Sequence, residues 1–507
     1  MQSAIGGDGA LFAAGHVDGS LLSELGRVLE YQSDRCGKGV GVGGSVGPLW
    51  WRTAGQSRLL AAGRLTVLLG RLYIRECKHF RRQEAAVPNA DLDARSRRWA
   101  VTNDPALLWP DLDVRLLPAA AKAIERAVAQ VLDGRNTSLG APNGADAHAI
   151  GIAALISGTG PLLGYWVELG QLDVSAPLAL LLARHLRHGR GRVRRIGREI
   201  TPALWNLVDA GVEPGILKGF HTAHVYYPEP GVRPLSDVDV YVEPRLVGLA
   251  STALASAGFG PGTWSAEFKT NWYPRGRISP IRSLEFWHVR SPWGIELHSA
   301  LEFGALVRHG IRLERTIPVA EPWTWNAFPL RVAPQPLRFV AVAAHLSQEL
   351  HAARLIRLIE LTLMIRRDIP SGELNWHALT DFLEQTGATS FAYPALALVE
   401  QLAPGTIDDA LLAKTRMRAT RIARAVVADL TPATPLLHER VSLAERLMWE
   451  TGVIAIMRRF FRMLVPIGGR SAREDVTIYW SRVVRLLTGR VTWRLGSRAR
   501  KSTTVRV

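Results

Sequence analysis

Apolar residues recur at three- and four-residue spacing along much of the chain, which is the pattern of helices that bury one face. Before residue 210 this pattern predicts helices over 107–132, 176–187 and 199–209. After Pro336 it is nearly continuous and predicts four more helices, over 339–350, 353–366, 376–386 and 392–402. We therefore expect mostly helical regions on both sides of the segment between them.

The middle segment shows the alternation of strands that bury one face. Residues 238–242 alternate in this way, and 284–289 and 295–300 flank the turn-forming sequence Arg290-Ser-Pro-Trp-Gly294, which predicts a hairpin. A helix is expected over 245–257, ending at Gly258. Strands enclosed by helical regions predict an α+β fold with a small sheet.

Residues 149–167 form the longest uncharged stretch and are the strongest candidate for a membrane span. Four glycines and Pro161 interrupt the stretch, whereas a spanning helix needs about 20 mostly apolar residues. We expect a buried helix here. Residues 1–19 lack a basic leader before an apolar run, so no signal peptide is predicted.

Composition narrows the class of protein. The 507 residues suggest two to four structural units, and 62 Lys and Arg against 45 Asp and Glu give a net charge of +17. Two cysteines, Cys36 and Cys77, are too few for a disulfide framework or a cysteine zinc cluster. These features exclude small secreted and zinc-ribbon proteins and indicate a basic cytoplasmic protein with an anionic partner.

A dense basic run, residues 184–195, follows the second predicted helix. It fits either a contact with a polyanion or a solvated helix face or linker. No aromatic residues interrupt the run to form a stacking platform for bases, so we favour the solvated face.

Asp237 and Asp239 carry the strongest chemical signal. Residues two apart on a strand point to the same face, so the two carboxylates lie side by side while Val238 and Val240 face the core. Adjacent carboxylates repel unless a cation lies between them. Mg²⁺ is such a cation, because it takes oxygen ligands at about 2.1 Å and shares its coordination with substrate phosphates.

Glu296 supplies a third carboxylate on the next predicted strand element. Three carboxylates can hold two metal ions, one that activates an attacking oxygen and one that stabilises leaving pyrophosphate. Glu285 is a rival with the same local pattern, but the turn ending at Gly294 favours Glu296. His298 shares the face of Glu296, where it either assists the site or packs in the core.

Residues upstream of the aspartates suit phosphate binding. Lys218 and Gly219 close a predicted strand just before a short helix over 221–226, and amides at a helix start bind phosphate oxygens. Arg233 and Ser236 precede the carboxylates and provide guanidinium and hydroxyl donors for a triphosphate.

At these residues the sequence resembles the nucleotidyltransferase superfamily with a DNA polymerase β-like fold. It is most similar to the bacterial uncharacterised nucleotidyltransferase family, over residues 160–400 and including a helical region with His345. The matching motifs are Leu217-Lys218-Gly219, Tyr227-Pro228, Arg233-Pro234-Leu235-Ser236-Asp237-Val238-Asp239 and Glu296-Leu297-His298.

The resemblance implies a small mixed sheet that binds an NTP with Mg²⁺ or Mn²⁺. It implies transfer of NMP to an acceptor that the sequence does not identify, with release of pyrophosphate. The carried-over roles are metal binding by Asp237, Asp239 and Glu296, with Glu296 helping to deprotonate the acceptor. Lys218, Gly219 and Ser236 would hold phosphates. The sequence departs from the wider superfamily in having Phe220, not serine, after Gly219.

On this basis we divide the chain into five parts. We expect a poorly defined, partly disordered region over 1–104 and a helical region over 105–200. A catalytic domain over 201–330 follows, then a helical domain over 331–410 and a basic helical region over 411–507.

Several basic residues and histidines keep more than one interpretation. Lys269, Arg275, Arg277 and Arg282 are expected in a loop, facing either the nucleotide or solvent. His345 and His351 are six residues apart and do not form a metal pair, so we expect packing roles.

The basic C-terminal region leaves an alternative function open. Its arginines, at 458, 459, 462 and within 494–501, together with Trp480 and Trp493, could contact nucleic acid or an anionic membrane. The alternative is therefore an inactive nucleotidyltransferase-like protein that binds one of these partners. We favour the active enzyme, with NTP and the acceptor as its partners and nucleic acid as a less favoured one.

Overall fold

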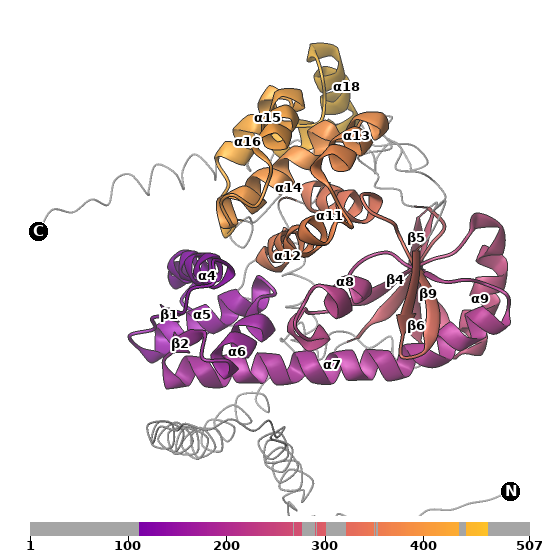
Figure 1. Cartoon of the computed structure of the whole chain (residues 1–507), viewed down its shortest axis with the longest axis horizontal. Helices are drawn as coiled ribbons and strands as arrows, with labels where there is room; N and C mark the ends of the chain where they lie inside the picture. Colours follow the sequence, from indigo (N-terminus) through magenta and orange to yellow (C-terminus); the bar gives the residue numbers. More distant parts are fainter. Residues whose placement is uncertain are drawn as a thin grey trace, which may run out of the picture. The chain divides into compact units, whose positions relative to one another are not determined.

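The structure is a computed structural model that describes residues 111–266, 268–275, 289, 292–300, 321–348, 350, 353–434 and 443–464 (Figure 1). The predictions made for residues 1–104 and for the chain after residue 464 therefore lie outside the described residues. So do those for Arg277, Arg282, Glu285, His351 and residues 284–288.

A seven-stranded mixed sheet forms the centre of the fold, in the order β5-β6-β7-β4-β3-β9-β8. Its pairs are antiparallel except for β4 with β7 and β3 with β9, which are parallel. The strands are β3 (Gly215–Ile216), β4 (Asp237–Tyr241), β5 (Phe259–Ala266), β6 (Lys269–Pro274), β7 (Gly294–His298), β8 (Glu321–Trp325) and β9 (Phe328–Val332).

Helical segments precede and follow the sheet strands along the sequence, which confirms the predicted α+β architecture. The segments before and beside the sheet are η2 (Val114–Leu116), α4 (Leu117–Leu132), α5 (Gly144–Ile156), α6 (Gly160–Glu168), α7 (Ala176–Asp209), α8 (Phe220–Val225), η3 (Pro230–Val232), η4 (Pro244–Leu246) and α9 (Val247–Ser256). A short parallel pair, β1 (Thr137–Leu139) and β2 (Leu172–Val174), lies among them.

The helices that follow the sheet agree closely with those predicted after Pro336. They are α11 (Leu337–Gln348), α12 (Leu355–Ser371), α13 (Trp376–Thr386), α14 (Thr389–Leu402), α15 (Asp409–Arg418), α16 (Arg421–Ala428), α17 (Leu443–Leu447) and α18 (Val453–Leu464). One continuous apolar core joins α4–α6 to α11–α16, because buried residues from Leu112 to Met448 pack in a single cluster.

One face of the sheet is apolar and buried, and the other carries the charged side chains of β4 and β7. Val238, Val240, Ile295 and Leu297 are buried in a second core with residues of α7 and α9. Figure 1 shows the sheet nearly edge-on between α9 and α8. Because side chains alternate along a strand, Asp237, Asp239, Glu296 and His298 lie on the face opposite that core.

The basic run belongs to one long helix, so the predicted break before residue 199 is wrong. Helix α7 spans 34 residues without interruption. Its arginines also do more than face solvent: Arg192 is 2% exposed and donates hydrogen bonds to the carbonyl oxygens of Leu235 (2.5 Å) and Pro292 (2.8 Å). Arg190 pairs with Glu168 and Glu229. Arg190 and Arg192 therefore join α7 to α6 and to the segments that precede β4 and β7.

A second correction concerns the segment between the carboxylate strands. Lys269 and Arg275 were expected in a loop, but Lys269 begins β6 and Arg275 directly follows it. The hairpin of β8 and β9 was also not predicted. Glycine and proline residues, such as Gly260 and Pro329, break the apolar alternation that identifies strands.

Among the described residues, no single helix is long and apolar enough to cross a membrane. Helices α5 and α6 pass that test only as a pair, and they are bent by 117° at the break between them. Most of their residues are buried in the core that they share with α7, as expected for the uncharged stretch.

Arg192 provides a test of this role for the basic run. We expect Arg192→Ala to lower the free energy of unfolding by about 2–4 kcal/mol, because it empties buried space and leaves two carbonyl groups unpaired. Urea unfolding followed by circular dichroism measures the change. Arg194→Ala, at an exposed position of the same helix, is the control. Equal effects of the two substitutions would contradict the assignment.

Candidate active site

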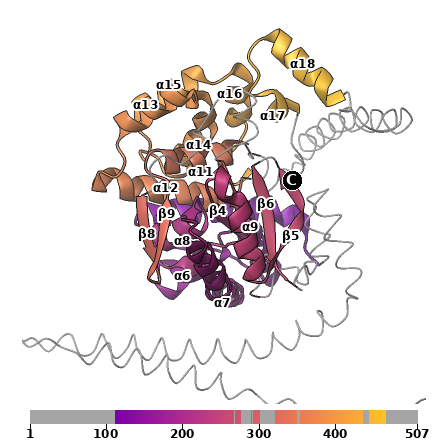
Figure 2. The same cartoon turned by 90° about the vertical axis from the view of Figure 1, so that its right-hand side faces the viewer.

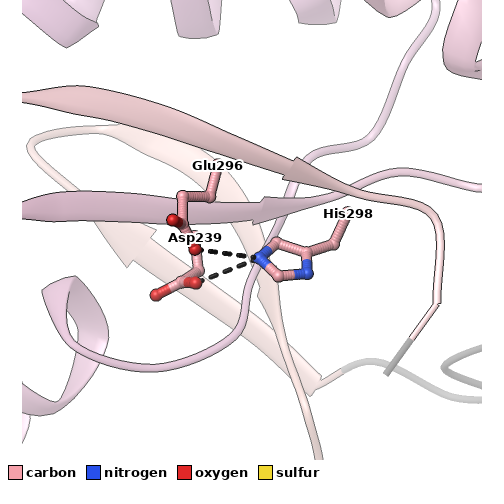
Figure 3. A group of neighbouring side chains, drawn as sticks. All are labelled: Asp239, Glu296 and His298. Atoms are coloured by element: carbon pink, nitrogen blue, oxygen red, sulfur yellow. Dashed lines mark hydrogen bonds and ion pairs between the residues drawn. The ribbon is translucent and has the colours of Figure 1, made fainter. Parts of the chain in front are cut away.

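Asp239 is the central charge of the site. It lies in the middle of β4, and only 1% of its side chain is exposed. The Lys218 ammonium donates to both carboxylate oxygens, with Nζ at 2.7 Å from Oδ1 and 2.8 Å from Oδ2. His298 Nε2 lies 3.0 Å from Oδ1 (Figure 3). A buried carboxylate is costly unless it is paired, and here two basic groups pair with it.

Glu296 reaches the same point from the neighbouring strand. Parallel pairing of β4 and β7 sets Asp239 opposite Glu296 and Tyr241 opposite His298. One ligand atom each of Asp239, Glu296 and His298 lies within 4.8 Å of the other two, and Figure 3 shows the three side chains converging. Glu296 also forms an ion pair with Lys269, which antiparallel pairing places on the adjacent strand β6.

Asp237 stands at the edge of this cluster. It begins β4, two residues before Asp239, and is partly exposed, but it is not among the three residues whose ligand atoms converge. Burial and the nearby Asp239 charge raise the pKa of the Asp237 carboxyl, while Lys218 and a hydrogen bond from Ser236 oppose this rise. Asp237 therefore lies within the electrostatic reach of the cluster.

The pKa shifts of the paired groups reflect their mutual stabilisation. Burial would raise the pKa of Asp239, but Lys218 and His298 hold it well below its usual value. Burial would likewise lower the pKa values of Lys218 and His298, yet the carboxylates raise both. The arrangement thus favours a charged carboxylate beside charged basic groups.

The predicted phosphate segment lies directly beside this cluster. Lys218 follows β3, and Gly219 has a positive φ of 58° before α8 begins at Phe220. Glycine adopts this conformation without the steric cost that a Cβ imposes. Ser236 is exposed at the start of β4. Lys218, Gly219 and Ser236 are therefore near the carboxylates, as their predicted role requires.

Arg233 has a different environment from the one expected for a free phosphate ligand. Its guanidinium forms a two-point ion pair with Glu360 on α12, with Nε and Nη2 each 3.0 Å from a carboxylate oxygen. Side-chain exposures of 13% and 2% show that the pair is mostly buried, and Thr222 also hydrogen-bonds Glu360. Arg233 therefore links the segment before β4 to helix α12.

Sequence reasoning gave too small a role to Lys269 and missed Glu360. Lys269 was placed in a loop because the strand pattern of β6 is weak, and Glu360 lies in a helix that reads as an ordinary amphipathic one. Both are joined to the site by long-range contacts, which local periodicity does not report. The sequence allowed His298 either to assist the site or to pack in the core. In the structure it lies in the cluster with Asp239 and Glu296.

The donor set suits a divalent cation. Two carboxylates on adjacent strands supply hard oxygen ligands, and Asp237 offers a third nearby. His298 adds a nitrogen, which manganese accepts more readily than magnesium does. In the structure, Lys218 pairs with Asp239 and Lys269 pairs with Glu296, so each carboxylate has a positively charged partner.

The middle part of the chain matches a known protein family. Residues 153–404 match the model of a family described as uncharacterised nucleotidyltransferase. No curated protein and no solved structure shows a significant match to the chain. The matched segment contains every residue of the cluster, as well as Arg233 and Glu360.

The ion pair between Arg233 and Glu360 generates a stability prediction. We expect Glu360→Ala to lower the free energy of unfolding by about 3–5 kcal/mol, because it leaves a buried guanidinium without its partner. Denaturant unfolding of the full chain measures the change. Glu384→Ala, which removes the partner of Lys414 in a surface ion pair, should have little effect. A small loss in Glu360→Ala would show that Arg233 does not depend on Glu360.

Proposed function

Because residues 153–404 belong to the uncharacterised nucleotidyltransferase family, we propose that this chain moves an NMP group from an NTP to an acceptor and releases pyrophosphate. The observation that carries the proposal is the convergence of Asp239 and Glu296 from parallel neighbouring strands, beside Lys218 and Gly219. We place the reaction in the cytoplasm, in keeping with the two cysteines of the chain.

Asp237, Asp239 and Glu296 would hold Mg²⁺ or Mn²⁺ at this site. Such a cation, when bound, supplies Lewis-acid stabilisation of charge on the phosphate oxygens. The carboxylates of β4 and β7 are held in fixed positions by strand pairing, so little reorganisation is needed to present them. Lys269 forms an ion pair with Glu296 from β6, which orients this carboxylate.

The phosphate chain would lie against Lys218, Gly219 and Ser236. A lysine ammonium binds phosphate as a point charge, and the exposed Ser236 hydroxyl would exchange its hydrogen bond to Asp237 for one to a phosphate oxygen. Gly219 lets a ligand approach the backbone where α8 begins. Arg233 would act on this segment indirectly, through its ion pair with Glu360.

Glu296 would take a proton from the acceptor, the role that the family resemblance implies for it. An acceptor oxygen or other nucleophile would form a bond to the α-phosphorus while the bond from that phosphorus to the oxygen bridging to the β-phosphate breaks. The acceptor proton passes to the Glu296 carboxylate and then to solvent, and pyrophosphate leaves with the bridging oxygen.

Removing the central carboxylate tests this reaction. We expect Asp239→Asn to lower the rate of pyrophosphate release about a hundredfold or more, because it removes a charge that acts in the transition state. The assay follows pyrophosphate with each α-³²P-labelled NTP in Mg²⁺ or Mn²⁺. Glu243→Gln, at an exposed carboxylate just after the same strand, is the control. Activity unaffected by Asp239→Asn would exclude the proposed site.

Lys218 supplies a test that does not depend on turnover. Its ammonium donates hydrogen bonds to the Asp239 carboxylate, which would bind the cation. Because this positive charge competes with a metal ion, Lys218→Met should tighten Mn²⁺ binding in the absence of nucleotide by about tenfold or more. The same substitution should weaken NTP binding. Electron paramagnetic resonance of free Mn²⁺ and fluorescence of a labelled NTP measure the two effects. Lys414→Met is the control, and unchanged Mn²⁺ affinity in Lys218→Met would contradict this assignment.

A further inference from the structure

Helix α18 exposes an apolar surface that the catalytic site does not use. Eight large apolar side chains are exposed among the described residues, and three of them lie on this one helix. Val453 is 75% exposed, Ile454 77% and Met457 46%. At 100° per residue these positions fall within one 100° arc of the helix, so they form a continuous stripe.

Arg458 borders this stripe, because it is exposed and lies next to Ile454 around the helix. Arg459 lies on the other side of the helix, 3.9 Å from Glu450. The sequence of α18 contains three arginines and no acidic residue. Residues 465–507 then carry ten Lys and Arg against two acidic residues. In the sequence, a strongly basic segment thus directly follows the helix that carries the apolar stripe.

The helix also occupies a peripheral position. Both views show α18 extending beyond the neighbouring helices of the domain after the sheet (Figures 1 and 2). Within the described residues it packs chiefly against α17. It lies beyond residue 404, where the match to the nucleotidyltransferase family ends.

We propose that α18 binds the surface of an anionic lipid membrane, with Val453, Ile454 and Met457 inserted between the headgroups. A helix with an apolar stripe and a basic residue such as Arg458 on its flank lies in the plane of the interface, where lipid phosphates attract the positive charge. Nucleic acid would use the arginines but leave the aliphatic side chains in water. A symmetric contact between two copies would bring the basic flanks of both helices together.

Vesicle sedimentation of the full chain tests this proposal. The chain should sediment with vesicles made of equal parts phosphatidylcholine and phosphatidylglycerol, and not with phosphatidylcholine alone. Binding should weaken as salt is raised, because the attraction to the anionic surface is screened.

Paired substitutions test the stripe itself. The double substitution Ile454→Asp and Met457→Asp should reduce vesicle binding at least tenfold, because aspartate cannot enter the interface. Leu249→Asp, at a 51% exposed apolar position on α9, is the matched control and should bind as the unchanged chain does. Both altered positions are exposed, and unchanged thermal unfolding of the variants would show that the fold is kept.

Five results would overturn the proposal. Four are absence of binding to the anionic vesicles, equal binding of the double variant, equal loss in Leu249→Asp, and a dimer in solution that the double variant abolishes. The last result would assign the stripe to a second copy of the chain. Binding of single-stranded RNA that the double variant weakens as much as vesicle binding would also count against it. Pyrophosphate release without vesicles should be the same in both variants, so this test is independent of the proposed reaction.

Discussion

The buried negative charge of Asp239 is the constraint around which the site is organised. A carboxylate with 1% exposure is stable only beside basic groups, and Lys218 and His298 provide them from two different segments. Parallel pairing of β4 with β7 brings Glu296 opposite Asp239, so a second negative charge must be accommodated next to the first. Lys269 does this from β6. The pairing of β6, β7 and β4 therefore brings the charged side chains together on one face of the sheet, while the apolar side chains of β4 and β7 pack on the other face.

The surrounding domain holds these strands in place through further charged contacts. Arg192 on α7 donates to carbonyl groups just before β4 and β7, the two strands that carry the carboxylates. Arg233 joins the segment before β4 to Glu360 on α12. In each case an arginine is buried among backbone or carboxylate acceptors. Part of the basic composition of the chain thus serves its internal structure.

Much of this fold follows from periodicity, and the exceptions have physical reasons. The helices after Pro336 and the strand β4 are strongly patterned and were predicted close to their observed bounds. Strands β5, β8 and β9 contain glycine or proline, the apolar alternation of β6 is weak, and these four strands were missed. Asp237, Asp239, Glu296 and Lys218 could be selected because their residue types and spacing carry chemical information. The partners Lys269 and Glu360 depend on strand order and on a contact between α12 and the site, which the local pattern does not contain.

A diffraction measurement addresses the central claim most directly. Crystals of the chain soaked with Mn²⁺ and a non-hydrolysable NTP would be measured for the anomalous signal of manganese. The account predicts a peak between the carboxylates of Asp239 and Glu296, with the triphosphate beside Gly219 and Lys218 moved off Asp239. A peak elsewhere, with Lys218 still paired to Asp239 and the nucleotide remote from both strands, would contradict it.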